Sequence, residues 1–195
     1  ARLRHLPFTA PAMLQRNFPG DDEFIRTIDA AVRCGGERAV TDALRNALCR
    51  MIREQRVKLP DCVFEPCGEH YARRELYHSE DLGYDVIAMT WGPGQGTLLH
   101  DHSGLWCVEG VWQGALEITQ YDLVEAAEPR FRFRPVGSIQ AGKGSAGSLI
   151  PPHEYHTIRN PAADAVAVSV HIYARQMTCC STFSGQLASQ KEPQA

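Results

Sequence analysis

The sequence predicts a mainly β protein, either a barrel or a sandwich, with helices at its N-terminal end. From residue 84 onward, short runs rich in strand-forming residues are separated by glycine-rich turns, and no helical pattern interrupts them. The run YDVIAMTW at 84–91 is followed by the turn GPGQG, and the runs at 115–121, 130–134 and 165–173 alternate or nearly alternate in polarity. Many short strands without intervening helices are typical of β-sandwiches and β-barrels.

The N-terminal third carries apolar residues at helical spacing. Asp21 can cap a first helix, and the Gly35-Gly36 pair would end it. A second helix is expected from about residue 40 to residue 56. The apolar residues that would form the buried faces of the two helices are Phe24, Ile25, Ile28, Ala31 and Val32, then Val40, Leu44, Leu48, Met51 and Ile52.

The 195 residues fit a single domain, residues 1–195, with a sizeable core. We expect a helical part at 20–57, a change of architecture in the segment rich in Pro, Cys and Gly at 59–68, and a β-barrel over about 70–185. The tail after Ser184 is polar and is expected to be frayed.

Composition and charge exclude several classes of partner. The net charge of -3 gives no electrostatic basis for binding nucleic acid or an anionic membrane. No apolar run approaches the ~20 residues that span a bilayer, and the first residues contain no apolar signal-peptide core. The seven cysteines are an odd number without a CxxC pair, which favours reduced thiols and a cytoplasmic protein.

Three histidines are the strongest candidates for a metal site. His100 and His102 are two residues apart, so on a strand both imidazoles point to the same face. His156 lies in a second segment, after a Pro-Pro turn. Three neutral imidazoles can bind one face of a metal ion and leave coordination positions open. A histidine on a β face is more often a packed or exposed residue than a ligand, so the HxH pair by itself leaves both interpretations open.

The segment 165–173 places three polar side chains on one face. Alternation puts Ser169, His171 and Tyr173 on the same side of a strand, while valines and Ile172 occupy the other side. The apolar side is expected to pack outward against a second layer. The polar side is either the solvent face of the strand or a hydrogen-bonded relay that ends in Tyr173 near the metal.

The spacing of these residues resembles the two cupin motifs. The first motif expects a glycine, an HxH pair and a second glycine, and the second expects a proline-rich turn, a histidine and an asparagine. The matching residues are Gly94, His100, His102 and Gly114, then Pro151, His156 and Asn160. Cys107 occupies the position of the glutamate ligand, so the site is expected to hold three histidines and no carboxylate.

This departure, together with SVHIY at 169–173, makes roughly residues 71–180 similar to the thiol dioxygenases, above all the cysteine dioxygenase type I family. The resemblance implies a jelly-roll-like cupin barrel in which His100, His102 and His156 hold Fe(II). It further implies that O2 oxidises a small thiol acid to a sulfinate, with L-cysteine as the favoured substrate. Tyr173 would orient the bound oxygen or substrate, and His171 and Ser169 would fix its position.

The resemblance also assigns three further positions. A thioether between a cysteine and the tyrosine of this family would here join Cys107 to Tyr173, although Cys107 could equally be a buried apolar residue. The carboxylate-binding Tyr-x-Arg of the family corresponds to Tyr71 and Arg73, with Arg74 as the alternative. An arginine suits a thiol acid because its guanidinium binds a carboxylate bidentately.

Several alternatives remain open. A related enzyme could oxidise 3-mercaptopropionate or mercaptosuccinate instead of cysteine, and the protein could be a cupin that binds a metal or ligand without turnover, or a metal-dependent isomerase. The expected partners are a small thiol and O2, in a monomer or small homo-oligomer. His153 is expected at the rim of the site, and Trp91 is expected to be a core aromatic residue.

Overall fold

The computed structural model describes residues 1–7, 12–13, 17–128 and 130–184. The frayed tail expected after Ser184 lies outside these residues. Two helices and twelve strands are assigned in the described chain, with one short 3-10 turn. Their bounds are β1 Arg2–Pro7, β2 Ala12–Met13, α1 Asp21–Val32, α2 Glu37–Glu54, η1 Asp61–Phe64, β3 Ala72–His78, β4 Asp85–Trp91, β5 Leu99–His100, β6 Cys107–Gln113, β7 Ala115–Ala127, β8 Arg130–Gly142, β9 Ala146–Leu149, β10 His156–Arg159, β11 Ala167–Tyr173 and β12 Cys179–Ser184.

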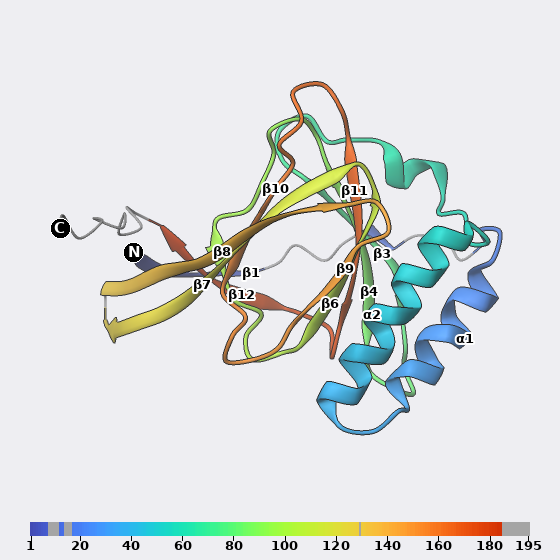
Figure 1. The fold of residues 1–195 in the computed structure, drawn as a ribbon, viewed down its shortest axis with the longest axis horizontal. Helices are drawn as coiled ribbons and strands as arrows, with labels where there is room; N and C mark the ends of the chain where they lie inside the picture. Colours follow the sequence, from blue (N-terminus) through green and yellow to red (C-terminus); the bar gives the residue numbers. More distant parts are fainter. Residues whose placement is uncertain (8–11, 14–16, 129, 185–195) are drawn as a thin grey trace.

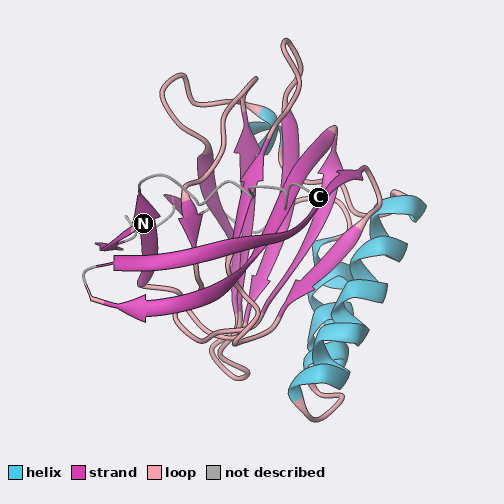
Figure 2. Cartoon of the chain, turned by 60° about the vertical axis from the view of Figure 1, so that its left-hand side comes forward, coloured by secondary structure: helices cyan, strands magenta, loops and turns pink. Residues whose placement is uncertain are grey.

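The strands form two facing layers. One has the order β1-β12-β5-β10-β7-β8 and closes on itself, and the other has the order β2-β3-β4-β11-β6-β9. Figures 1 and 2 show that α1 and α2 lie side by side against the outer face of the second layer, while the β7–β8 hairpin extends away from the helices. The predicted mainly β architecture with N-terminal helices is therefore confirmed.

The predicted end residues of the helices need correction. Gly20, not Asp21, precedes α1, and its φ of 87° lies in the left-handed region. A Cβ at Gly20 would lie 2.5 Å from the Arg56 carbonyl oxygen, so glycine fits this approach. Asp21 instead is the first residue of the helix, where its negative charge interacts favourably with the positive end of the helix dipole. Helix α2 spans Glu37–Glu54, three residues earlier than expected at its start and two at its end.

The two faces of β11 pack into two different apolar clusters. The outward face contributes Val168, Val170 and Ile172 to a cluster with the apolar residues of the two helices, as the alternation predicted. The inward face carries Ser169, His171 and Tyr173, all three buried. Between the layers lies a second apolar cluster that includes Ile87, Met89, Trp91, Cys107 and Tyr173. The polar face of β11 is therefore an interior face of the barrel, not its solvent face.

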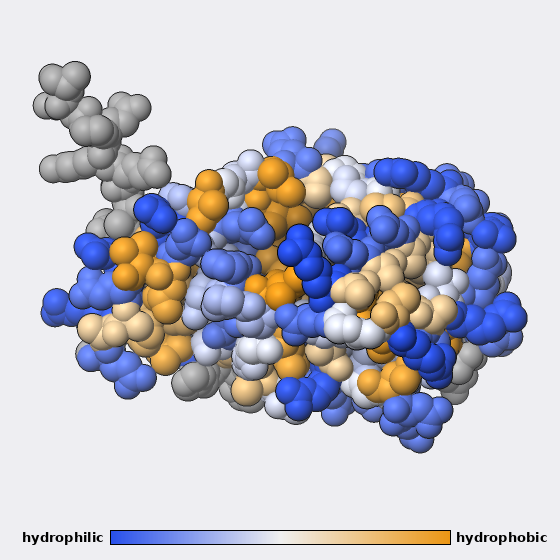
Figure 3. Space-filling model, turned by 60° about the horizontal axis from the view of Figure 1, so that its bottom comes forward, coloured by the Kyte–Doolittle hydropathy of each residue, from blue (hydrophilic) through white to orange (hydrophobic). Residues whose placement is uncertain are grey.

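Three of the four exposed large apolar side chains of the described residues lie on the β7–β8 hairpin. In Figure 3, hydrophilic and hydrophobic residues are interspersed over the face shown. Among large apolar residues of the described chain, Leu98, Val124, Val136 and Ile139 are exposed. None of the described helices is both long and apolar enough to cross a membrane.

Candidate metal centre

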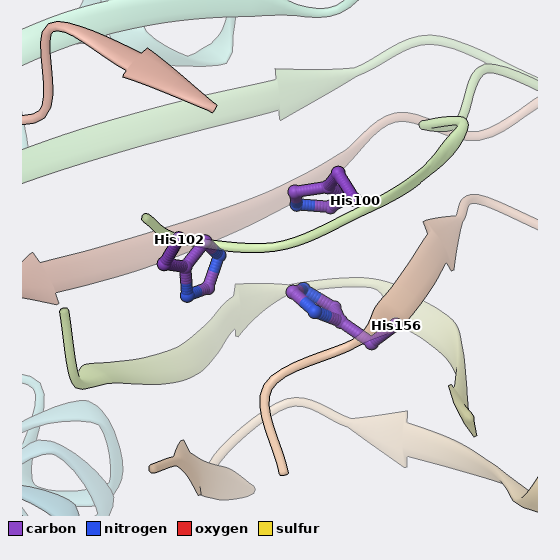
Figure 4. Close-up of side chains that lie close together, drawn as sticks. All are labelled: His100, His102 and His156. Atoms are coloured by element: carbon purple, nitrogen blue, oxygen red, sulfur yellow. The ribbon is translucent and has the colours of Figure 1, made fainter. Parts of the chain in front are cut away.

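Two chain segments bring the three predicted histidines together. His100 ends β5, His102 follows in the next loop, and His156 begins β10, where it is the cross-strand partner of His100. Their rings point toward one another in Figure 4. The ring centroids lie 4.3–5.4 Å apart, and one donor nitrogen from each ring falls within 4.8 Å of the others. This convergence fits three imidazole ligands of one metal ion.

Backbone hydrogen bonds fix the tautomers of two of these rings. His100 Nδ1 lies 3.0 Å from the Leu98 carbonyl oxygen, and His156 Nδ1 lies 2.8 Å from the Glu154 carbonyl oxygen. Because a carbonyl only accepts, each Nδ1 carries the hydrogen and each Nε2 presents a lone pair. In the described part of the chain, His156 Nε2 and His102 Nδ1 are buried without a hydrogen-bond partner. Such unpartnered buried nitrogens are the donor set that a metal would satisfy.

The three imidazoles are held neutral. Burial lowers the pKa of His100, and burial together with the neighbouring imidazoles lowers the pKa of His102 and His156 well below the ordinary value. A metal ligand must be deprotonated, so neutral imidazoles are already in the binding form at neutral pH.

Glu154 links the segment that carries His102 to the segment that carries His156, and this role was not predicted from the sequence. Its side-chain Oε2 accepts the His102 backbone N–H at 3.2 Å, while its own carbonyl accepts from His156. Glu154 is itself buried. These two contacts therefore set the position of His102 relative to His156, and they cannot be inferred from the spacing of the motif residues. Asn160, the last residue of the second motif, likewise donates to the backbone carbonyls of Trp91 and Ala165 and ties the adjacent turns together.

A hydrogen-bonded chain runs along the interior face of β11. The Trp91 indole N–H donates to Ser169 Oγ at 2.9 Å, and Ser169 Oγ lies 2.7 Å from His171 Nε2. Trp91 is a fully buried core aromatic residue as predicted, but it is also the first donor of this chain. The link between Ser169 and His171 is therefore present, and Trp91 extends it in the direction away from Tyr173.

Beyond His171 the chain differs from the expected relay. The rings of His171 and Tyr173 are stacked with centroids 6.1 Å apart, whereas His171 Nδ1 lies 3.3 Å from Glu109 Oε2 and 4.0 Å from Cys107 Sγ. Tyr173 instead packs edge-on against His102, with a centroid distance of 5.3 Å. Cys107 and Tyr173 are cross-strand partners on β6 and β11. The Tyr173 side chain is hydrogen-bonded to Cys107, and its relation to His171 among the described side chains is ring stacking.

Sheet register distinguishes the two candidate arginines. Arg73 pairs with Met89, which faces the barrel interior beside Ser169, whereas Arg74 pairs with Ala88 on the face covered by the helices. The positive charge of Arg73 contributes to lowering the pKa of His100, His102 and His171, which places it beside the site. Arg74 is engaged elsewhere, donating to Thr90 Oγ1 and to the Glu65 carbonyl. The structure therefore places Arg74 on the face of β3 away from the three histidines, and Arg73 remains the candidate for substrate binding.

Tyr71 lies in contact with the same interior. Its ring stacks on Trp91 with centroids 4.5 Å apart, and burial raises the pKa of its hydroxyl against the opposing charge of Arg73. His153, expected at the rim, is exposed and stands outside the group of three imidazoles.

Known proteins resemble the part of the chain that contains these site residues. The family model described as cysteine dioxygenase type I matches residues 68–186, more than half of the chain, and this span contains the three histidines and β11. The chain belongs to the cysteine dioxygenase type I family. That family is one of metalloenzymes, in agreement with the convergent imidazoles.

Individual members of the cysteine dioxygenase family are distant relatives. The cysteine dioxygenase type 1 of Danio rerio is 25% identical over 120 residues, which cover 62% of this chain and 59% of that protein. The rat protein of the same name is 24% identical over 118 residues, covering 56% and 54%. The chain therefore spans less than two thirds of the length of these relatives.

One solved structure supports the fold alone. A conserved protein with a double-stranded β-helix domain from Klebsiella pneumoniae aligns with a TM-score of 0.50 and 16% identity, covering 67% of this chain and 93% of that protein. The predicted cupin barrel is thereby confirmed.

Proposed function

We propose that this protein is an iron(II)-dependent thiol dioxygenase that adds both atoms of O2 to the sulfur of a small thiol acid, with L-cysteine as the favoured substrate and cysteine sulfinate as the product. One observation carries the proposal: three neutral imidazoles converge without a carboxylate among them, with Arg73 and Tyr173 beside them. A neutral ligand set suits the binding of an anionic thiolate.

His100, His102 and His156 would hold the ferrous ion. The ion would supply the redox chemistry that joins O2 to the sulfur, and its positive charge would lower the pKa of the substrate thiol. The buried, unpartnered nitrogens of His102 and His156 support this assignment. Glu154 would keep the two ligand segments in register.

Arg73 would bind the substrate carboxylate. Its guanidinium offers a bidentate pair of donors in the correct plane for a carboxylate. Tyr71, stacked on Trp91, would bound the pocket on the same side. A carboxylate held by Arg73 would leave the thiol end of a short substrate free to approach the three histidines, whose pKa values the charge of Arg73 affects.

Tyr173 would act as a hydrogen-bond donor toward the reacting atoms. Burial raises the pKa of its hydroxyl well above the ordinary value, so the phenol keeps its proton at neutral pH. Its contact with His102, a proposed metal ligand, supports this role. His171 and Ser169 would hold the adjacent face of β11 in place.

We propose that a thioether can join Cys107 to Tyr173, and their cross-strand pairing on β6 and β11 supports this. A bond between Sγ and the phenol ring removes one hydrogen from the thiol and one from the ring, and O2 with iron would accept the two electrons and two protons. We expect a fraction of protein exposed to iron, thiol and O2 to be lighter by two hydrogens, as measured by intact mass. The deficit should be absent in Cys107→Ala, and an undiminished wild-type mass would rule out the link.

The experiment that tests the proposed function is a thiol panel. Iron(II)-loaded protein is given L-cysteine, 3-mercaptopropionate, mercaptosuccinate or cysteamine, and oxygen uptake and product mass are recorded. One-for-one uptake of O2 with a product that gains two oxygen atoms supports the dioxygenase, and the preferred thiol identifies the substrate. If no thiol reacts while the histidines hold iron, the protein is a binding cupin or a cupin of different chemistry.

A further inference from the structure

The buried carboxyl group of Glu109 lies inside the barrel and has no role in the reaction proposed above. Glu109 on β6 is the cross-strand partner of His171 and is only 6% exposed. Its Oε2 lies 3.3 Å from His171 Nδ1 but makes no well-aligned hydrogen bond with the described residues. A buried carboxyl oxygen without a full partner is uncommon and calls for a role.

The hydrogen bonds on the other side of His171 define which nitrogen faces Glu109. Ser169 Oγ accepts the Trp91 N–H, so its single hydroxyl hydrogen is available to His171 Nε2. Burial, with the charge of Arg73 next in size, lowers the pKa of His171 to about 3, so the ring is neutral and carries one hydrogen. That hydrogen belongs on Nδ1, whose polar neighbours are Glu109 Oε2 at 3.3 Å and Cys107 Sγ at 4.0 Å.

We propose that Glu109 is a positioning residue for the proposed oxidation, which fixes the tautomer and orientation of His171 by accepting its Nδ1–H and exchanges its own proton with solvent through the adjoining cavity. His171 in turn packs on Tyr173 and contacts Cys107, so its orientation sets the position of the phenol beside the metal ligands.

The cavity next to Glu109 gives this carboxyl its route to solvent. A space of about 70 Å³ is lined by Glu109 and Ser169 on the interior side and reaches Ser145 and the exposed Ile139 on the outer side. This volume has room for water, which needs ~10–15 Å³. Glu109 is the only titratable side chain among the residues that line it.

Charges around Glu109 are few. His171 and Tyr173 face it from β11, Cys107 faces it from its own strand, and Arg73 acts on those three from β3. Strand β9, paired on the other side, contributes only the uncharged AGSL. Burial raises the pKa of Glu109 to about 7. The carboxyl therefore changes charge in the neutral range, and its ionised form attracts the Nδ1–H more strongly than its neutral form.

Metal-free protein provides a test that does not depend on turnover. Protein with 15N-labelled histidine is followed by long-range proton–nitrogen correlation from about pH 6 to about pH 9, a range that brackets a carboxyl titrating near neutrality. We expect His171 in the Nδ1–H tautomer, with shifts that titrate near pH 7 as Glu109 ionises. Glu109→Gln keeps an acceptor but should abolish this titration, and Glu109→Leu should mix the tautomers.

Kinetics of the iron-loaded protein provide the second readout. Loss of a group that orients a neighbour of the metal site commonly costs 10–100-fold, so we expect kcat to fall roughly 10-fold in Glu109→Gln with KM little changed. The acidic limb of the kcat profile, near pH 7 in the wild type, should disappear. Glu75→Gln is the matched control, because Glu75 is another buried carboxyl whose pKa is raised by burial, but it faces Asp85 and His78. This control should keep the wild-type titration of His171.

The outcomes separate this inference from the proposed function. If wild-type His171 does not titrate near pH 7, or titrates equally in Glu109→Gln, the positioning role is wrong. Two metal ions per chain that fall to one in Glu109→Gln would also overturn it, because Cys107, Glu109 and His171 would then be a second metal site. If the predicted titration is present but no thiol is oxidised, the positioning role stands and the dioxygenase proposal fails.

Discussion

Substitution of His156 by alanine should abolish both metal binding and thiol oxidation. His156 supplies the fully buried Nε2 that has no other partner among the described residues, and its backbone lies opposite His100. Removal of a direct ligand should cost more than the 10–100-fold typical of an outer partner, so we expect a loss of at least about 100-fold in kcat/KM. Metal content per chain and oxygen uptake measure the two effects.

His153→Ala is the control for this variant. His153 lies three residues earlier in the same segment, but it is exposed and outside the group of three imidazoles. It should retain wild-type metal content and activity. Full activity and metal binding in His156→Ala, or their loss in His153→Ala, would show that the wrong histidine has been assigned.

Replacement of Arg73 by glutamine should weaken the binding of thiol acids and leave thiols without a carboxylate unaffected. A hydrogen bond to a charged group contributes about 1.5–3 kcal/mol, which corresponds to a KM for L-cysteine raised roughly 10- to 100-fold. Cysteamine has no carboxylate, so its oxidation should change little. The ratio of kcat/KM for the two thiols therefore measures recognition of the carboxylate separately from any general damage to the site.

Arg74→Gln provides the matched comparison one residue away. Its guanidinium bonds Thr90 and Glu65 on the opposite face of β3, so this variant should lose stability but keep the wild-type ratio. A change of the ratio in Arg74→Gln and not in Arg73→Gln would reverse the assignment that the strand register supports.

Strand alternation predicted the parts of the site that lie on single segments. The alternation of β11 put Ser169, His171 and Tyr173 on one face, with Val168 and Val170 on the other, and this depends only on the period of a strand. The HxH spacing predicted that His100 and His102 converge, and they do, but only His100 lies on a strand; His102 follows in the loop, so the period of a strand is not the reason. The mainly β fold with N-terminal helices followed from the same kind of local pattern.

Residues whose roles depend on pairing between strands could not be predicted in this way. The choice between Arg73 and Arg74 required the register of β3 against β4, because a shift of one residue moves a side chain to the other face. Glu109 lies two residues after Cys107 on β6, and only the pairing of β6 with β11 brings Glu109 to His171. Glu154 acts through its backbone as well as its side chain, and no spacing encodes that.

The most direct test of the central claim is the mass of the product formed by iron-loaded protein from L-cysteine, or from the thiol preferred in the panel, under 18O2. A dioxygenase is expected to place two heavy oxygen atoms in one sulfinate, with none of them taken from water. A product with one heavy oxygen, or a disulfide with none, would contradict the claim that these three histidines support dioxygenation of a thiol.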